Sequence, residues 1–296
     1  MTAPAIRFGM FLSQANRQWP EMLEEFLLAE ELGFDHAWLV DHLLDTDGPP
    51  EHPCHEAWTL LAALAARTSR IRLGILVSSN TFRHPALLLK EAVTVDHVSG
   101  GRLILGLGAG WHADEHRRNG IALPEPAERV DRFEEAVELI ARLMETGRLT
   151  FGGRFYTLDD ARLEPPPLQQ PRIPVLIAAH RPRMIGIAAR WADQWDTFPA
   201  LEGTATDGVA DDIERRVELF EAACHAAGRD ATRIRRSTWA GPEATRSVDA
   251  FEEFVRRHRA LGFTDFSVTR PVPASDETLE TIAREVIPEL RREFAA

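Results

Sequence analysis

The chain has 296 residues, 44% of them hydrophobic, and a formal net charge of -12. This composition suits a globular domain with a large core, and the acidic balance argues against nucleic-acid binding, which needs clustered Lys and Arg. No stretch approaches the ~18 uncharged apolar residues of a membrane helix, and no basic region precedes a long apolar run at the start. We therefore expect no membrane span, no signal peptide and a cytoplasmic location.

Short β-rich runs alternate with amphipathic helical patterns along the chain. The spacing of apolar residues predicts, in chain order, strand 6–12, helix 21–32, strand 36–40, helix 58–68, strand 71–77, helix 85–98, strand 103–107 and helix 127–144. After a break it predicts strand 175–178, helix 182–191, strand 194–197, helix 212–227, strand 233–239, helix 248–261, strand 264–268 and helix 278–294. Pro288 is expected to bend the last helix.

The break covers residues 147–173. They are typical of a hairpin, around 149–151 and 155–158, followed by a proline-rich run. Eight strands alternating with helices indicate parallel βαβ units. We therefore expect an α/β fold, a (β/α)₈ TIM barrel that forms a single domain over residues 1–296, with 147–173 inserted between the fourth and fifth strands. A doubly wound open sheet is the alternative, but the first βα turn has no G-x-G-x-x-G.

In such a barrel the active site lies at the carboxyl ends of the strands. Asp41 and His42 follow the second strand. Histidine titrates near neutrality, so the pair is a candidate for acid–base catalysis or for hydrogen bonding to a coenzyme ring. The alternative is that Asp41 caps the next segment and His42 is solvated. Further polar or aromatic residues after strands are expected to line a substrate pocket, namely Gln14, Trp111, Glu115 and Trp239.

Three other segments are candidates for binding a coenzyme. Ser78, Ser79 and Asn80 follow the third strand, and Gly108 and Gly110 lie in a glycine-rich loop after the fourth. Such glycines permit close approach of a flat ligand, or serve only a tight turn. Ala179, His180 and Arg181 precede a helix start, where free N–H groups and the helix dipole attract phosphate. The alternative for this last segment is a basic surface turn.

His112 and His116 are spaced to share one helix face, which a divalent metal could use. The spacing lacks the Glu of a zinc-protease motif, so a solvated helix start is favoured and we expect no metal. A metal-dependent hydrolase would nevertheless use these histidines or His42, and it is kept as an alternative of another class.

Several motifs occur together and carry a family resemblance. They are FGMFL (8–12), AEELGFD (29–35), VDH (40–42), TSRIRLG (68–74), FRHPALL (82–88), DHVSGGR (96–102), GLGAGW (106–111) and AARWADQW (188–195). In these motifs the chain resembles the luciferase-like monooxygenase family, and most of all its actinobacterial branch that uses the deazaflavin coenzyme F-420. The resemblance covers nearly the whole chain and weakens after about residue 200.

The resemblance implies a role for each candidate. Asp41 and His42 would lie near the coenzyme ring or substrate. Ser78 and Ser79 would lie at a bulge where related enzymes hold a non-proline cis peptide that backs the ring. Gly108 and Gly110 would let the ring approach. The backbone of Ala179 and His180, with Arg181 nearby, would hold the phosphate, although many relatives have glycines there.

The resemblance also implies the activity. We expect hydride transfer between F-420 and a small organic substrate, with His42 as proton donor or acceptor and Asp41 orienting it or bonding the coenzyme. Some deazaflavin dehydrogenases carry a Glu where Trp111 stands, which argues against a sugar-phosphate substrate. The pocket walls are expected from 43–57, the 147–173 insertion and the last strand ends.

The alternatives are an FMN-dependent monooxygenase served by a separate flavin reductase, and a coenzyme-binding protein without turnover. Similar proteins are often homodimers.

Overall fold

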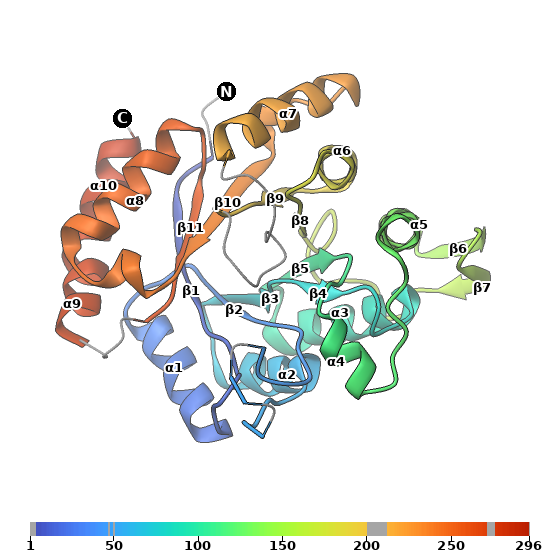
Figure 1. Ribbon diagram of the computed structural model, residues 1–296, viewed down its shortest axis with the longest axis horizontal. Coiled ribbons are helices and arrows are strands. Elements are labelled where there is room, and N and C mark those ends of the chain that lie inside the picture. Colours follow the sequence, from blue (N-terminus) through green and yellow to red (C-terminus); the bar gives the residue numbers. More distant parts are fainter. Residues whose placement is uncertain (1–3, 47, 50, 200–211, 271–275, 296) are drawn as a thin grey trace.

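The computed structural model describes residues 4–46, 48–49, 51–199, 212–270 and 276–295. Within them, eight parallel strands close into a barrel surrounded by helices (Figure 1). The barrel strands are β1 (Arg7–Phe11), β2 (His36–Leu39), β3 (Arg72–Ile75), β5 (Leu103–Gly108), β8 (Val175–Ala178), β9 (Gln194–Asp196), β10 (Arg235–Ala240) and β11 (Asp265–Val268). Each pairs with its neighbour in this order, and β1 pairs with β11. The predicted TIM barrel is confirmed.

The helices follow the strands as the apolar spacing predicts. They are α1 (Trp19–Glu31), α2 (Ala57–Arg67), α3 (Pro85–Ser99), α5 (Pro126–Thr146), α6 (Pro182–Trp191), α7 (Ile213–Ala226) and α8 (Val248–Ala260). Each turns its apolar face toward the barrel: in α3, for example, Leu88, Leu89 and Ala92 are buried. Burial of these faces provides most of the stability of such helices.

Among the short elements that were not predicted, two border the barrel mouth. A two-residue strand, β4 (Ser78–Ser79), continues beyond β3 and pairs with the end of β5. A six-residue helix, α4 (Ala113–Arg118), follows the glycine-rich loop, and His112 caps it by accepting a hydrogen bond from the Glu115 N–H. Both are too short for a periodic pattern to show.

The segment 147–173 contains the expected hairpin, made of β6 (Arg148–Gly152) and β7 (Thr157–Arg162). It lies at the edge of the molecule, beside α5 (Figure 1). Its tip contacts the barrel loops where the Tyr156 hydroxyl accepts a hydrogen bond from Asn80. None of its residues lines the pocket described below, so the expectation that this insertion forms a pocket wall is wrong.

The last helix shows how the chain accommodates Pro288. The segment begins as α9 (Asp276–Thr281), widens into a π-helix (Ile282–Val286) and continues as α10 (Ile287–Ala295). The Ile287 N–H donates to the Ile282 carbonyl, five residues back. A proline in a helix removes one N–H donor and crowds the carbonyl four residues earlier. The wider π turn directly before Pro288 takes the place of the simple bend that was expected.

Candidate active site

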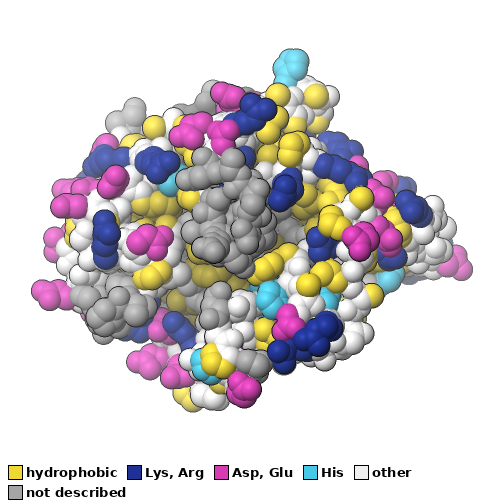
Figure 2. Space-filling view, in the orientation of Figure 1, with side chains coloured by type: hydrophobic (Ala, Val, Ile, Leu, Met, Phe, Trp, Pro, Cys, Tyr) yellow, Lys and Arg dark blue, Asp and Glu magenta, His cyan; other side chains and the backbone are white. Residues whose placement is uncertain are grey.

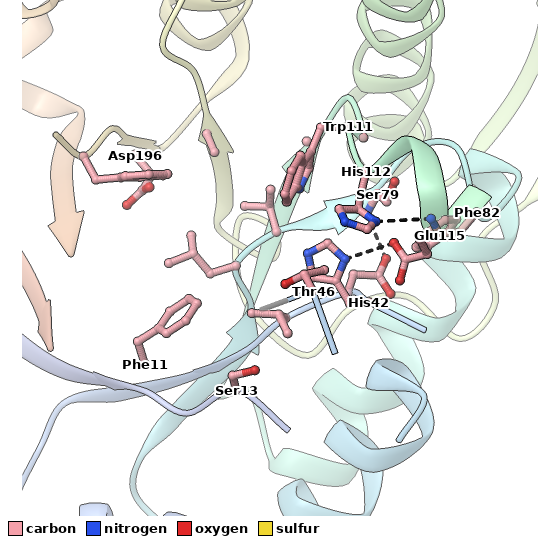
Figure 3. Close-up of a pocket in the computed structure, with 18 of the residues that line it drawn as sticks. Phe11, Ser13, His42, Thr46, Ser79, Phe82, Trp111, His112, Glu115 and Asp196 are labelled. Atoms are coloured by element: carbon pink, nitrogen blue, oxygen red, sulfur yellow. Dashed lines mark hydrogen bonds and ion pairs between the residues drawn. The ribbon is translucent and has the colours of Figure 1, made fainter. Parts of the chain in front are cut away.

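A cavity of about 200 Å³ opens at the carboxyl ends of the barrel strands. Its described lining is Phe11, Ser13, Val40, Asp41, His42, Thr46, Leu76, Val77, Ser79, Phe82, Gly108, Gly110, Trp111, His112, Glu115, His116, Ala178, His180, Asp196, Phe198 and Trp239. His42, His112 and Trp111 lie on one side, and Asp196 and Phe11 on the other (Figure 3). On the face of the molecule shown in Figure 2, acidic and basic side chains are interspersed over the surface.

His42 is held by Glu115. Its Nδ1 lies 3.0 Å from Glu115 Oε2, and the Leu43 N–H donates to the other carboxylate oxygen. Glu115 is buried. Burial acts to raise the pKa of Glu115, but the hydrogen bonds from His42 and the Leu43 N–H outweigh it and lower the pKa. An ionised carboxylate only accepts hydrogen bonds, so His42 donates to Glu115 through a proton on Nδ1.

Asp41 does not orient His42, contrary to one of the two roles expected for it. Its Oδ2 accepts hydrogen bonds from the Ser79 N–H at 2.8 Å and from Arg83 Nη1 at 2.7 Å. Burial raises the pKa of Asp41, and Arg83 and the Ser79 N–H oppose that shift. Its Oδ1 is buried without a partner among the described residues. Asp41 lines the pocket, so a group bound there is a candidate partner for this oxygen.

Arg83 was missed by sequence reasoning. Besides Asp41 it bonds Glu56 and lies 3.3 Å from Glu91, so one guanidinium ties the loop after β4 to α2 and α3. The FRHPALL motif contained this arginine, but a single basic residue in a loop gives no sign of its partner.

A non-proline cis peptide joins Leu76 and Val77, immediately before Ser78, and both residues line the pocket. Two glycines in the second half of β5, Gly106 and Gly108, face this segment. A Cβ on Gly106 would overlap the Ile75 carbonyl, and one on Gly108 would lie 2.5 Å from Val77 Cγ2. Residues 75–81 approach β5 so closely that packing within the protein alone requires glycine at these positions, whether or not a ligand is bound.

A chain of hydrogen bonds runs from α4 to the pocket. His116 Nδ1 lies 2.7 Å from the His112 carbonyl, and its Nε2 lies 2.6 Å from Thr81 Oγ1, which is 2.7 Å from Ser79 Oγ. A carbonyl only accepts, so a neutral His116 donates through Nδ1 and accepts the Thr81 proton at Nε2. Thr81 then accepts from Ser79, and Ser79 Oγ presents its lone pairs to the pocket.

The same chain of bonds bears on the metal alternative. Both ring nitrogens of His116 are engaged, and the His112 Nδ1 accepts the Glu115 N–H. Across the described parts of the chain, no group of three or more His, Cys, Asp or Glu side chains is arranged to hold a metal ion. The two histidines therefore do not form a shared metal site in this geometry.

Only part of the segment 179–181, the candidate phosphate site, is free to bind a phosphate. The Ala179 N–H donates to the Asp196 carbonyl at 3.0 Å, so it cannot hold a phosphate, contrary to expectation. His180 lines the pocket and bonds Thr197 Oγ1 at 2.9 Å. Burial, with help from Arg216 and Arg181, lowers the pKa of His180 to about 3, so its ring is neutral. Arg181 is exposed and precedes α6, whose first turn has no capping side chain.

Three further candidates lie outside the pocket lining. Gln14 is fully buried, and its amide bonds the Val40 backbone on both sides and the His55 carbonyl, so it fastens β1 to β2 and is not a pocket residue. Asn80 points to Tyr156. Ser78 is buried and its hydroxyl has no partner in the described chain.

Trp111 and Trp239 are in the lining, as expected. Trp111 meets His42 edge-on, with ring centroids 5.8 Å apart.

Together these features define an enzyme-type (β/α)₈ barrel, with a polar pocket at the strand ends, a histidine–carboxylate pair and a cis peptide after the third barrel strand. The sequence model of the luciferase-like monooxygenases matches residues 6–282. The chain therefore belongs to the luciferase-like monooxygenase family, and the predicted family is confirmed.

Curated relatives include F-420-dependent glucose-6-phosphate dehydrogenases and a pyrimidine monooxygenase. F-420-dependent glucose-6-phosphate dehydrogenase of Microbacterium testaceum is 29% identical over 100% of both chains. The protein of the same name from Amycolatopsis mediterranei is 34% identical over 67% of this chain and 64% of its own length. Pyrimidine monooxygenase RutA of Caulobacter vibrioides is 30% identical over 76% of this chain and 66% of its own.

Solved structures support the fold. An F-420-dependent secondary alcohol dehydrogenase, in complex with an F-420-acetone adduct, superposes with a TM-score of 0.81 at 18% identity, over 95% of this chain and 98% of that chain. The F-420-dependent tetrahydromethanopterin reductase of Methanopyrus kandleri gives 0.76 at 21% identity, over 97% and 99%. None of the helices in the described residues is long and apolar enough to cross a membrane.

Proposed function

We propose that this chain is an oxidoreductase that transfers a hydride between coenzyme F-420 and a small organic substrate, with His42 as the catalytic proton donor or acceptor. The observation that carries the proposal is the His42–Glu115 pair at the pocket, in a chain whose relatives include F-420-dependent dehydrogenases. Bound F-420 would supply or accept the hydride.

His42 would accept or donate the proton that accompanies the hydride transfer. When an alcohol carbon loses a hydride, its hydroxyl must lose a proton, and His42 Nε2 would accept it. In the reverse direction the same nitrogen would return the proton to the carbonyl oxygen. Glu115 is the positioning residue: its charge fixes the proton on Nδ1 and stabilises the positively charged ring that forms.

The residues present fit a deazaflavin or flavin. Asp41 Oδ1, buried and unpartnered in the described chain, would accept a hydrogen bond from a ring N–H. Leu76 and Val77, which line the pocket, would pack against the ring. The first turn of α6 and Arg181 would hold the phosphate without the Ala179 N–H.

The second candidate is a monooxygenase that uses reduced FMN and O₂, and the similarity to RutA favours it. The same pocket and the same helix start would serve FMN. This candidate requires a separate flavin reductase as a partner.

We further propose that residues 1–296 act as one domain. A cytoplasmic location and a homodimer stay predictions.

Turnover assays test the proposal. F-420 is incubated anaerobically with a panel of alcohols, amines and glucose 6-phosphate, and loss of the oxidised coenzyme is followed by its visible absorbance. Reduced FMN is tested in parallel for substrate-dependent O₂ consumption. The proposal expects F-420 reduction that His42→Ala lowers by at least ~100-fold. Oxygen-dependent turnover with FMN alone would favour the monooxygenase, and unchanged turnover in His42→Ala would remove His42 from its role.

A further inference from the structure

Asp196 lies at the end of β9 and lines the pocket, across from His42 (Figure 3). Its Oδ1 accepts a hydrogen bond from Ser237 Oγ at 2.7 Å. Its Oδ2 is buried and has no hydrogen-bond partner in the part of the chain that the structure describes. Only 1% of this residue is exposed. A buried carboxyl oxygen left without a partner is unfavourable, so a pocket that keeps one there is suited to a ligand that supplies it.

We propose that Asp196 is a specificity-determining residue whose Oδ2 accepts a hydrogen bond from a hydroxyl or protonated amine of the substrate. The proposal rests on the proposed function, because it assigns the substrate class of the same pocket. The substrate is then a neutral or cationic molecule with an apolar body, and an organic anion is disfavoured.

The walls beside Asp196 indicate the apolar body. The Trp239 ring stacks on Phe11, with centroids 4.7 Å apart and planes 5° apart, and packs against Phe198 at 4.6 Å. All three residues line the pocket with Asp196. Aromatic rings of this kind bury apolar groups, and they also attract organic cations.

The charges around the pocket indicate the sign of the substrate. Three carboxyl groups line it, from Asp41, Glu115 and Asp196, and no Lys or Arg belongs to the described lining. His180 on β8 is neutral because burial lowers its pKa to about 3. Arg216 on α7 donates to Thr197 Oγ1 and to the Phe198 carbonyl. Such a field favours cations and neutral donors over anions.

The ionisation of Asp196 is expected to change when a hydrogen-bond donor of the substrate binds beside it. Burial, with a smaller contribution from Asp265 on β11, raises the pKa of Asp196 to about 7, against the hydrogen bond from Ser237 on β10. A bound ammonium or hydroxyl would stabilise the ionised form. Binding of an amine is therefore expected to tighten as the pH rises from 6 to 8.

The test uses Asp196→Asn, which keeps the size of the side chain and an acceptor for Ser237. Glu243→Gln, at an exposed carboxylate in the loop after β10, is the matched control. The probes are cyclohexylamine, cyclohexanol and cyclohexanecarboxylate, which share one apolar body. Their dissociation constants are measured calorimetrically with the full chain, with and without bound F-420, and that of F-420 is measured separately.

The proposal expects the amine and the alcohol to bind the wild type at least ~10-fold more tightly than the carboxylate. Asp196→Asn should weaken amine binding ~10-fold or more and leave the dissociation constant of F-420 unchanged, while Glu243→Gln changes neither. Equal amine binding in wild type and Asp196→Asn, or no amine binding at millimolar concentration, would overturn it. So would a loss of F-420 binding alone, which would assign Asp196 to the coenzyme. Failure of the wild type to bind F-420 would contradict the proposed function but would leave the probe comparison as the test of Asp196.

Discussion

Glu115 Oε2 lies 3.0 Å from His42 Nδ1, although the two residues are separated by 73 positions in the chain. The loop after β2 and the short helix α4 after β5 bring them together at the barrel mouth. The contact fixes the proton of His42 on Nδ1 and leaves Nε2 for the proton transfer that we propose. It therefore links a local feature of the fold to the proton transfer that the proposed reaction needs.

Glu115→Gln removes the charge at this contact and should lower the hydride-transfer rate by about 10- to 100-fold. The Kd of F-420 should change little, because Asp41 and the α6 start remain. Stopped-flow reduction of bound F-420 by the best substrate of the panel measures the rate. Asp114→Asn, at an exposed carboxylate of α4 paired with Arg117 and Arg118, is the control. A wild-type rate in Glu115→Gln would show that the pair is not used in catalysis.

Arg83 compensates the buried charge of Asp41. Arg83→Met should destabilise the protein by about 3 kcal/mol, because it leaves a buried carboxylate without its cation. Urea unfolding measures the loss. The double variant Asp41→Asn/Arg83→Met should recover part of it, since the uncompensated charge is then gone. If the two losses simply add, Arg83 does not act through Asp41.

Gly106 tests the close approach of β3 and β5. Gly106→Ala should lower the free energy of unfolding strongly, by roughly 2 kcal/mol or more, because its Cβ would overlap the backbone of Ile75. Gly186, inside α6, has open space around its Cα, so Gly186→Ala should raise stability by about 0.5–1 kcal/mol. The two alanine variants are compared by urea unfolding, and similar effects would contradict the packing argument.

Asp196 gives the stability a pH dependence of defined sign. Its pKa of about 7 in the folded chain exceeds the ordinary value of 3.8, so the folded state holds this proton more tightly than the unfolded state. The stabilisation is present in full below pH 4 and is lost as the pH rises toward 7. Without ligand, Asp196→Asn should therefore gain roughly 3–4 kcal/mol relative to wild type between pH 4 and pH 8. A constant difference across this range would contradict the raised pKa.

Much of the fold could be predicted because strand and helix periods are local. Val175–Ala178 and Pro182–Trp191 are predicted to the residue, since a short apolar run and a Pro at the first helical position mark their limits. Periodicity could not show the two-residue strand β4 or the π segment before Pro288. These depend on a neighbouring strand and on a single missing N–H.

The sequence indicated where several site residues lie, but not which contacts they make. Position after a strand was enough to select Asp41, His42 and Trp239. It could not show that the Gln14 amide forms hydrogen bonds with the Val40 backbone, or that the Ala179 N–H donates to the Asp196 carbonyl. It also could not pair Arg83 with Asp41 or Glu115 with His42. Each of these contacts joins residues far apart in sequence, and one chain without relatives aligned gives no sign of such pairs.

A binding titration would show which coenzyme the pocket takes. Trp111 and Trp239 line the pocket, so a bound ring should quench the tryptophan fluorescence. F-420 and FMN, each oxidised and reduced, are titrated into the purified protein in parallel. We expect a sub-micromolar Kd for F-420 and binding of FMN that is at least ~10-fold weaker. Preferential binding of reduced FMN, or binding of neither coenzyme, would contradict this expectation.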